Sequence, residues 1–120
     1  MKIIMEKSVK SYLEKVGPLL LQKESCNNLM LGILDRLQLD KMDCNLGYVE
    51  ENGRVISAFM RTPPHNWIIA DVEGRNNGVS SAIADFLYKK GWEVPGVLGP
   101  VSDAETFIYR LKEPGFQQYV

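Results

Sequence analysis

The chain has 120 residues, and its 14 Lys and Arg against 15 Asp and Glu give a formal net charge of −1. This length predicts a single domain over residues 1–120, and the near-neutral charge excludes a strong electrostatic preference for nucleic acid or a membrane surface. Two cysteines and one histidine are too few for a disulfide scaffold or a four-ligand zinc site. No apolar run approaches the roughly 20 residues that span a bilayer. We therefore expect a cytoplasmic protein that holds no metal and binds neither nucleic acid nor membrane.

The N-terminal part of the chain predicts two helices. The first has Ser8 as its N-cap and ends at Gly17-Pro18. The second spans about residues 26–39 and is capped by Ser25. Gly32 lies inside it and costs about 1 kcal/mol relative to alanine, so we expect close helix packing at this position. The apolar positions of the first helix follow the i, i+3, i+4, i+7 spacing of one stripe, and they are Val9, Tyr12, Leu13 and Val16.

The middle of the chain predicts a β-hairpin with strands over residues 46–51 and 54–62. Asn52-Gly53 between them is the strongest short-range hairpin signal, because both turn residues must accept a positive φ. A two-residue loop places Val49 opposite Ile56. The second strand carries apolar residues on both faces, which predicts that both faces are covered.

The rest of the chain alternates strands with helices. Ser102, followed three residues later by Glu105, has the sequence of a capping box for the last helix. The fold class is therefore an α/β domain of the α+β type, in which helices pack on a small, mostly antiparallel sheet. The predicted elements are a strand at 67–72, a helix from 79 to about 90, a very short strand within 94–100, and a helix at 102–111.

Residues 74–81 form a glycine-containing loop before a predicted helix. Such a junction aims free backbone N–H groups and the positive end of the helix dipole at a phosphate. The loop lacks the lysine of a P-loop and the glycine spacing of a dinucleotide fingerprint. It does match, loosely, the Arg-x-x-Gly-x-small pyrophosphate loop of acyl-CoA-dependent acetyltransferases, which makes Arg75, Gly78 and Ser80 candidate cofactor-binding residues. The alternative is a surface turn capped by Asn77 or Ser80.

The segment between the second and third strands holds the other candidate side chains. His65 is the only imidazole, so a general base is one interpretation, and a rigid turn after two prolines is the other. Arg61 can bind a carboxylate or phosphate through its planar guanidinium, or pair with a surface acid. Arg61, His65 and Asn66 are therefore candidate substrate-binding residues, and no residue is identified as catalytic. Cys26 and Cys44 are expected to be buried or partly buried thiols without a redox role.

Three segments, in this order along the chain, together resemble a known family. They read Asn-Asn-Leu-Met-Leu-Gly-Ile-Leu at 27–34, Ala-Phe-Met-Arg-Thr-Pro-Pro-His-Asn at 58–66 and Val-Pro-Gly-Val-Leu-Gly-Pro at 94–100. The combination is similar to the N-terminal portion of predicted N-acetyltransferases of the GNAT superfamily, and it covers most of the chain. The resemblance implies a partial GNAT-like fold and transfer of an acetyl group from acetyl-CoA to an amine, without a covalent enzyme intermediate.

The resemblance also implies that the catalytic parts lie in another portion of such enzymes. There, a C-terminal half carries the pyrophosphate loop, the split strands that hold the pantetheine and the catalytic tyrosine. We therefore expect these 120 residues to be a non-catalytic N-terminal domain whose partner is that half. Two alternatives are a minimal acyl-CoA-binding protein that uses residues 74–80, and a small interaction domain that self-associates as a homodimer through sheet edges or apolar surface. The acceptor amine is not predicted.

Overall fold

The computed structural model describes residues 1–39, 43–73 and 77–111, which form four helices and one five-stranded sheet. The strand order is β1-β2-β3-β4-β5, with antiparallel pairing from β1 to β4 and a parallel β4–β5 pair. This confirms the predicted α+β class with a mostly antiparallel sheet. In chain order the elements are β1 (Lys2–Glu6), α1 (Val9–Leu21), α2 (Asn28–Leu39), β2 (Asn45–Glu51), β3 (Arg54–Arg61), β4 (Trp67–Ile69), α3 (Asn77–Lys89), β5 (Val97–Leu98) and α4 (Val101–Leu111).

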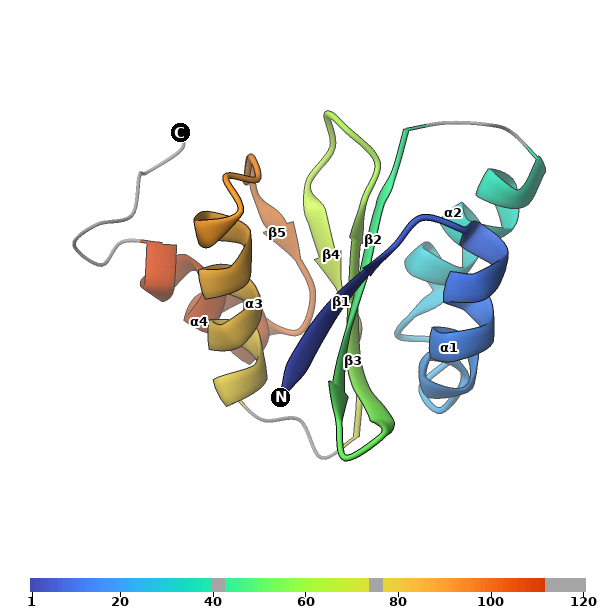
Figure 1. Ribbon diagram of the computed structural model, residues 1–120, viewed down its shortest axis with the longest axis horizontal. Coiled ribbons are helices and arrows are strands. Elements are labelled where there is room, and N and C mark those ends of the chain that lie inside the picture. Colours follow the sequence, from blue (N-terminus) through green and yellow to red (C-terminus); the bar gives the residue numbers. More distant parts are fainter. Residues whose placement is uncertain (40–42, 74–76, 112–120) are drawn as a thin grey trace.

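The sheet lies between two helical layers (Figure 1). Helices α1 and α2 cover one face, and α3 and α4 cover the other. Each face has its own apolar core: Tyr12 and Met60 belong to the first, and Phe59 and Trp67 to the second. Successive residues of β3 thus enter opposite cores, which confirms that this strand is covered on both sides. None of the helices in the described ranges is both long and apolar enough to cross a membrane.

Helix α1 extends past its predicted end. Ser8 is its N-cap, and the Ser8 side chain accepts a hydrogen bond from the backbone N–H of Ser11 at 3.1 Å. The helix continues through Pro18, so the prediction that Gly17-Pro18 ends it is wrong. Proline removes one helical hydrogen bond, but Leu19 and Leu20, which follow it, are both buried in the first core. Burial of these two side chains offsets the lost bond, and α1 gains a further turn.

The starts of α2, α3 and α4 differ from the prediction. Helix α3 begins at Asn77, two residues before the predicted start. Helix α2 begins at Asn28, so Ser25 does not cap it. A Cβ atom added at Gly32 would meet nothing within 4 Å, so no close helix packing explains that glycine. Helix α4 begins at Val101, which places Ser102 inside its first turn and not at the cap position.

The β2–β3 hairpin has the predicted turn and a different register. Asn52 and Gly53 form the turn with φ angles of 53° and 77°. A bulge between Val49 and Glu50 then shifts the pairing by one residue. Val49 therefore lies opposite Ser57 and not opposite Ile56 as predicted. A bulge adds one residue to one strand, and the apolar pattern on both faces of this hairpin carried no sign of it.

The edge strand β1 was missing from the predicted elements. It pairs with β2, and its side chains alternate between the two cores, with Ile4 against the first and Ile3 and Met5 against the second. Because all of these residues are apolar, the strand shows none of the polar alternation that marks a half-buried strand.

Gly47 and Phe59 lie directly opposite each other on β2 and β3. The Phe59 ring is fully buried, and a Cβ atom added at Gly47 would overlap it. The ring therefore occupies the space above the glycine, where any other residue would place its side chain. Close approach of another group is the usual reason for glycine inside a strand.

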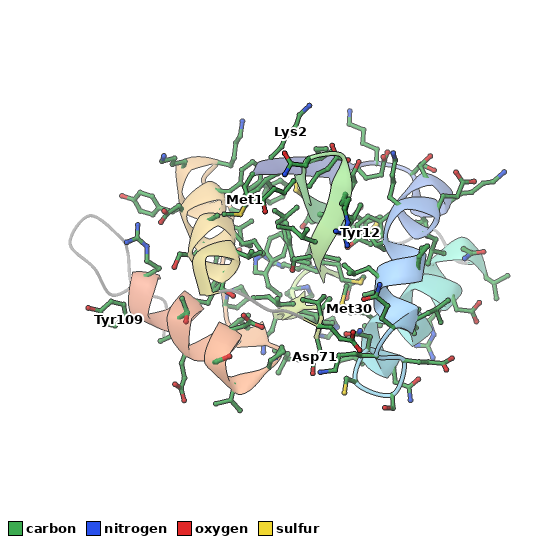
Figure 2. The ribbon with its side chains drawn as sticks, turned by 90° about the horizontal axis from the view of Figure 1, so that it is seen from below. Met1, Lys2, Tyr12, Met30, Asp71 and Tyr109 are labelled. Atoms are coloured by element: carbon green, nitrogen blue, oxygen red, sulfur yellow. The ribbon has the colours of Figure 1, made fainter. Side chains whose placement is uncertain are left out.

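Tyr12 connects α1 to the same strand pair. Tyr12 lies between α1 and the sheet (Figure 2). Its hydroxyl lies 2.9 Å from the carbonyl oxygen of Gly47 and 3.0 Å from that of Phe59. The single hydroxyl proton is shared between these two acceptors. Burial raises the pKa of Tyr12 well above its ordinary value of 10.0, and the hydrogen bond to the Phe59 backbone lowers it by a smaller amount.

Alanine substitution should have opposite effects at two glycines. Gly47→Ala forces the Phe59 ring out of a packed core, and we expect it to lower the free energy of unfolding by about 1–3 kcal/mol. Gly32→Ala meets no neighbour and should raise it by up to about 1 kcal/mol. Urea denaturation of both variants measures the difference, and equal effects at the two positions would contradict the packing described for Gly47.

Tyr12 should make the protein less stable at alkaline pH. Above pH 10 an unfolded chain releases the tyrosine proton while the folded chain keeps it, so the unfolded state binds fewer protons and stability falls as pH rises. Between one unit below and one unit above the ordinary pKa of 10.0, this residue alone should remove about 1.4 kcal/mol. The Tyr12→Phe variant should lose that much less over the same interval, as measured by urea denaturation. An identical loss in both proteins would show that Tyr12 ionises normally in the fold.

Candidate functional site

The end of β4 is held by the side chain of Asn27, which lies just before α2. Asn27 is only 3% exposed. Its Oδ1 accepts from the backbone N–H of Asp71 at 2.8 Å, and its Nδ2 donates to the Asp71 carbonyl at 2.9 Å. Nδ2 also donates to the carbonyl of Leu20 near the end of α1 at 3.1 Å. The amide thus pairs with the Asp71 backbone as a neighbouring strand would, and it ties this point to the helical layer.

Arg61 and Trp67 hold the segment between α3 and β5. Arg61, the last residue of β3, donates from Nη1 to the carbonyl of Glu93 at 2.7 Å. Trp67, the first residue of β4, donates from Nε1 to the same oxygen at 2.8 Å. Both side chains are buried, and the guanidinium carbon lies 5.9 Å from the centroid of the Trp67 ring. The candidate Arg61 therefore has a structural contact inside the fold and is not a surface residue.

The neighbouring candidates Asn66 and His65 differ in their surroundings. Asn66 is half-buried, and a Cβ atom added at Gly96 would lie 2.8 Å from its Oδ1. His65 is exposed, its backbone N–H donates to the carbonyl of Thr62 at 2.9 Å, and its imidazole has no hydrogen-bond partner within the described residues. Arg61 and Asn66 thus both contact the segment that leads into β5, while His65 belongs to a turn. The turn interpretation of His65 fits this geometry better than a general base.

The candidate cofactor-binding residues lie at the start of α3. Arg75 lies outside the described residues. Gly78 is exposed, and Ser80 is buried with its Oγ 2.6 Å from Oδ1 of Asp103. Asp103 is 3% exposed and belongs to the first turn of α4. A carboxylate of the protein itself therefore lies beside the first turns of α3, where an anionic ligand would be expected.

A cavity of about 350 Å³ adjoins this helix start, next to the turn of the β2–β3 hairpin. Its ionisable side chains are the carboxylates Glu51, Glu73 and Asp103 and the single guanidinium of Arg54. Carboxylates repel a pyrophosphate, and among the described residues of this cavity Arg54 is the one cationic side chain. The residues described at this site therefore do not fit a pyrophosphate.

A second cavity, of about 290 Å³, lies at the carboxyl ends of the parallel strands β4 and β5. Its lining is mixed: it includes Leu29 from α2, Ile68 from β4 and Leu98 from β5, together with the polar residues Asn27 and Asp71. Ligands of α/β sheets bind at this end of parallel strands. Cys26 also lines the cavity and is exposed, so the prediction of a buried or partly buried thiol is wrong for that residue.

Cys44, by contrast, is partly buried as predicted. Burial raises the pKa of its thiol, and the negative charge of Asp43 raises it further. A thiol with a raised pKa is a poor nucleophile at neutral pH. The described residues contain no group of three or more side chains that could hold a metal ion.

Sequence reasoning missed the two buried polar side chains that organise these sites, Asn27 and Asp103. Asn27 lay inside one of the quoted segments, but its type is equally common at the exposed start of a helix. Asp103 lay in the first turn of a predicted helix, where an acidic residue is expected for its charge alone. The local pattern did not indicate that Asn27 would bond to Asp71, 44 residues away. It also did not indicate that Asp103 would bond to Ser80, 23 residues away.

Replacing Asn27 should destabilise the fold much more than replacing its neighbour. Asn27→Ala leaves the Leu20 carbonyl and both backbone groups of Asp71 without their partner, so we expect a loss of about 3 kcal/mol in the free energy of unfolding. Asn28 is exposed, and Asn28→Ala should change stability by no more than about 0.5 kcal/mol. Urea denaturation of the two variants compares them directly, and similar values would show that the Asn27 bonds contribute little.

Comparison with known proteins adds no relative: no family model, no curated protein and no solved structure matches this chain.

Proposed function

We propose that this chain is an N-terminal domain of a GNAT-type N-acetyltransferase, with a structural and not a catalytic role. In this proposal the domain shapes the side of the cleft that receives the acceptor amine, and acetyl-CoA binds to the other half of the enzyme. The observation that carries the proposal is that the three segments that resemble this superfamily, far apart in sequence, all make contacts at β4 or its two ends.

Each segment contributes a different contact around β4. The first supplies Asn27, which pairs with the backbone just after the strand. The second supplies Phe59, which pairs with Ile69 of the strand, and the buried Arg61, whose guanidinium lies 5.9 Å from the Trp67 ring centroid. The third supplies Gly96, whose carbonyl accepts from the backbone N–H of Trp67 at 3.0 Å, and Gly99, where a Cβ atom would lie 3.0 Å from the carbonyl oxygen of Ile69. These contacts give the three segments a common physical reason to occur together, which a chance match would lack.

The surroundings of α3 support the non-catalytic part of the proposal. Ser80, a candidate cofactor residue, has its hydroxyl on the buried carboxylate of Asp103. A pyrophosphate at the same helix start would face that charge at close range. An N-terminal domain that leaves cofactor binding to another half of the enzyme needs no anion site here.

The cavity at the ends of β4 and β5 favours a second candidate, the minimal acyl-CoA-binding protein. Leu29, Ile68 and Leu98 offer an acyl chain an apolar surface. In this candidate Gly78 and Ser80 hold the pyrophosphate with their backbone N–H groups, and Arg75 adds charge. The carboxylates near the start of α3 repel a pyrophosphate, so we rank the acyl-CoA-binding candidate second.

Isothermal titration of the chain with acetyl-CoA and with CoA tests both candidates. We expect no saturable heat from either ligand, because the described helix start repels the pyrophosphate. Saturable binding in the micromolar range, about −8 kcal/mol, would overturn the non-catalytic proposal and support the acyl-CoA-binding candidate. In that event Gly78→Leu locates the site: lost binding assigns it to the start of α3, and unchanged binding excludes this loop.

A further inference from the structure

We propose that strand β1 is the interface of a homodimer, in which the β1 strands of two copies pair antiparallel and join the two sheets into one. Strand β1 is the first strand in the sheet order, and among the described residues it pairs with β2 alone. Its other side therefore presents backbone N–H and C=O groups that a second strand can bind. Figure 2 shows Lys2, at the start of this strand, on the outer surface of the molecule. The proposal rests on this edge and does not depend on an acetyltransferase function.

The apolar side chains of β1 are only partly covered by the fold. Ile3, Ile4 and Met5 pack against the two cores, yet all three are half-buried. The residues opposite them on β2 are all buried, since β1 lies beside those residues. A further strand on the open side of β1 would remove more apolar surface from water, which favours association.

The two ends of β1 carry opposite charges, with Lys2 at the first position and Glu6 at the last. In an antiparallel pair centred on Ile4, Lys2 of each copy lies opposite Glu6 of the other copy. Side chains at these alternate positions project from the same face of the sheet. Opposite charges that face each other across two strands stabilise the pair, and the twofold symmetry of the dimer forms this contact twice.

Both charged groups are available for this contact. Lys2 is exposed, and within the described residues it makes no hydrogen bond or ion pair with its side chain. Oε1 of Glu6 accepts from the backbone N–H of Lys7 at 3.1 Å. Its Oε2 therefore remains for the ammonium group of Lys2 in the other copy.

The same register also matches the backbone groups of the two strands. The N–H and C=O groups that point away from β2 belong to alternate residues of β1, and no proline interrupts this strand. Pairing centred on Ile4 sets Ile3 opposite Met5, so the outward groups of one copy meet outward groups of the other. A register displaced by one residue breaks this match, and one displaced by two residues loses both charge pairs. The sequence of β1 thus specifies one antiparallel register.

Sedimentation equilibrium of the chain, from micromolar to millimolar concentrations, tests for the dimer. We expect a reversible equilibrium between monomer and dimer. A pair of five-residue strands is smaller than a standard interface of about 1,600 Å², so we expect a dissociation constant in the micromolar range. A chain that remains monomeric at millimolar concentration would overturn the proposal.

Charge reversal at the two ends of β1 tests whether this strand is the interface. Lys2→Glu and Glu6→Lys each set like charges opposite each other at both ends of the strand pair. We expect either change to raise the dissociation constant about tenfold or more. The double variant Lys2→Glu/Glu6→Lys restores opposite charges at both ends and should dimerise as the native chain does.

A control variant separates this contact from the effect of net charge. Arg36 is exposed on α2, and Arg36→Glu alters the net charge by the same amount as Lys2→Glu. We expect Arg36→Glu to leave the dissociation constant unchanged. Dimerisation that neither single β1 variant weakens, or that the double variant does not restore, would assign the interface to another surface and contradict the proposal.

Discussion

The hydrogen bonds of the Asn27 side chain are the constraint on which the arrangement around β4 depends. Strand β4 has only three residues, and its parallel partner β5 has two. So short a pair has few ladder hydrogen bonds of its own. The Asn27 amide extends the pairing to Asp71 and joins it to the end of α1 through Leu20. Asn27 also lines the cavity between β5 and α2, so this anchor forms part of the cavity wall.

The second helical layer is organised by contacts between α3 and α4. Ser80 and Asp103 join the two helices near their first turns. Arg110 and Asp85 join them farther along, with Nη2 at 2.7 Å and Nε at 3.1 Å from the same carboxylate oxygen. One hydrogen bond is buried and one ion pair is partly exposed, so the pair of helices is fixed at two points. The buried hydrogen bond engages the Ser80 hydroxyl and holds the Asp103 carboxylate beside the first turns of α3.

Much of the architecture could be predicted because it depends on local signals. The Asn52-Gly53 turn requires positive φ angles that few residue types accept, and the Ser8 cap requires a short polar side chain. The failures have a common cause in long-range packing. Helix α1 continues through Pro18 because Leu19 and Leu20 are buried. The bulge at Val49 depends on how strands β2 and β3 pack together.

At the candidate sites the sequence indicated the chemistry of some residues but not the surroundings of those residues. The sequence identified Arg61 as a group suited to an anion because guanidinium chemistry belongs to the residue type. Its burial against Trp67 and its bond to Glu93, 32 residues away, depend on the folded chain. The same holds for the candidate Ser80, whose hydroxyl bonds to Asp103, 23 residues away.

The shortness of β5 has a consequence for how the molecule behaves beside copies of itself. An exposed sheet edge is a template on which another chain can add a strand. Here that edge consists of Val97 and Leu98, and Pro95 and Pro100 on either side carry no backbone N–H to donate. An incoming strand would find too few donors and acceptors to form a ladder. At its β5 edge the sheet thus resists the addition of another strand, even though Leu98 leaves apolar surface in contact with water.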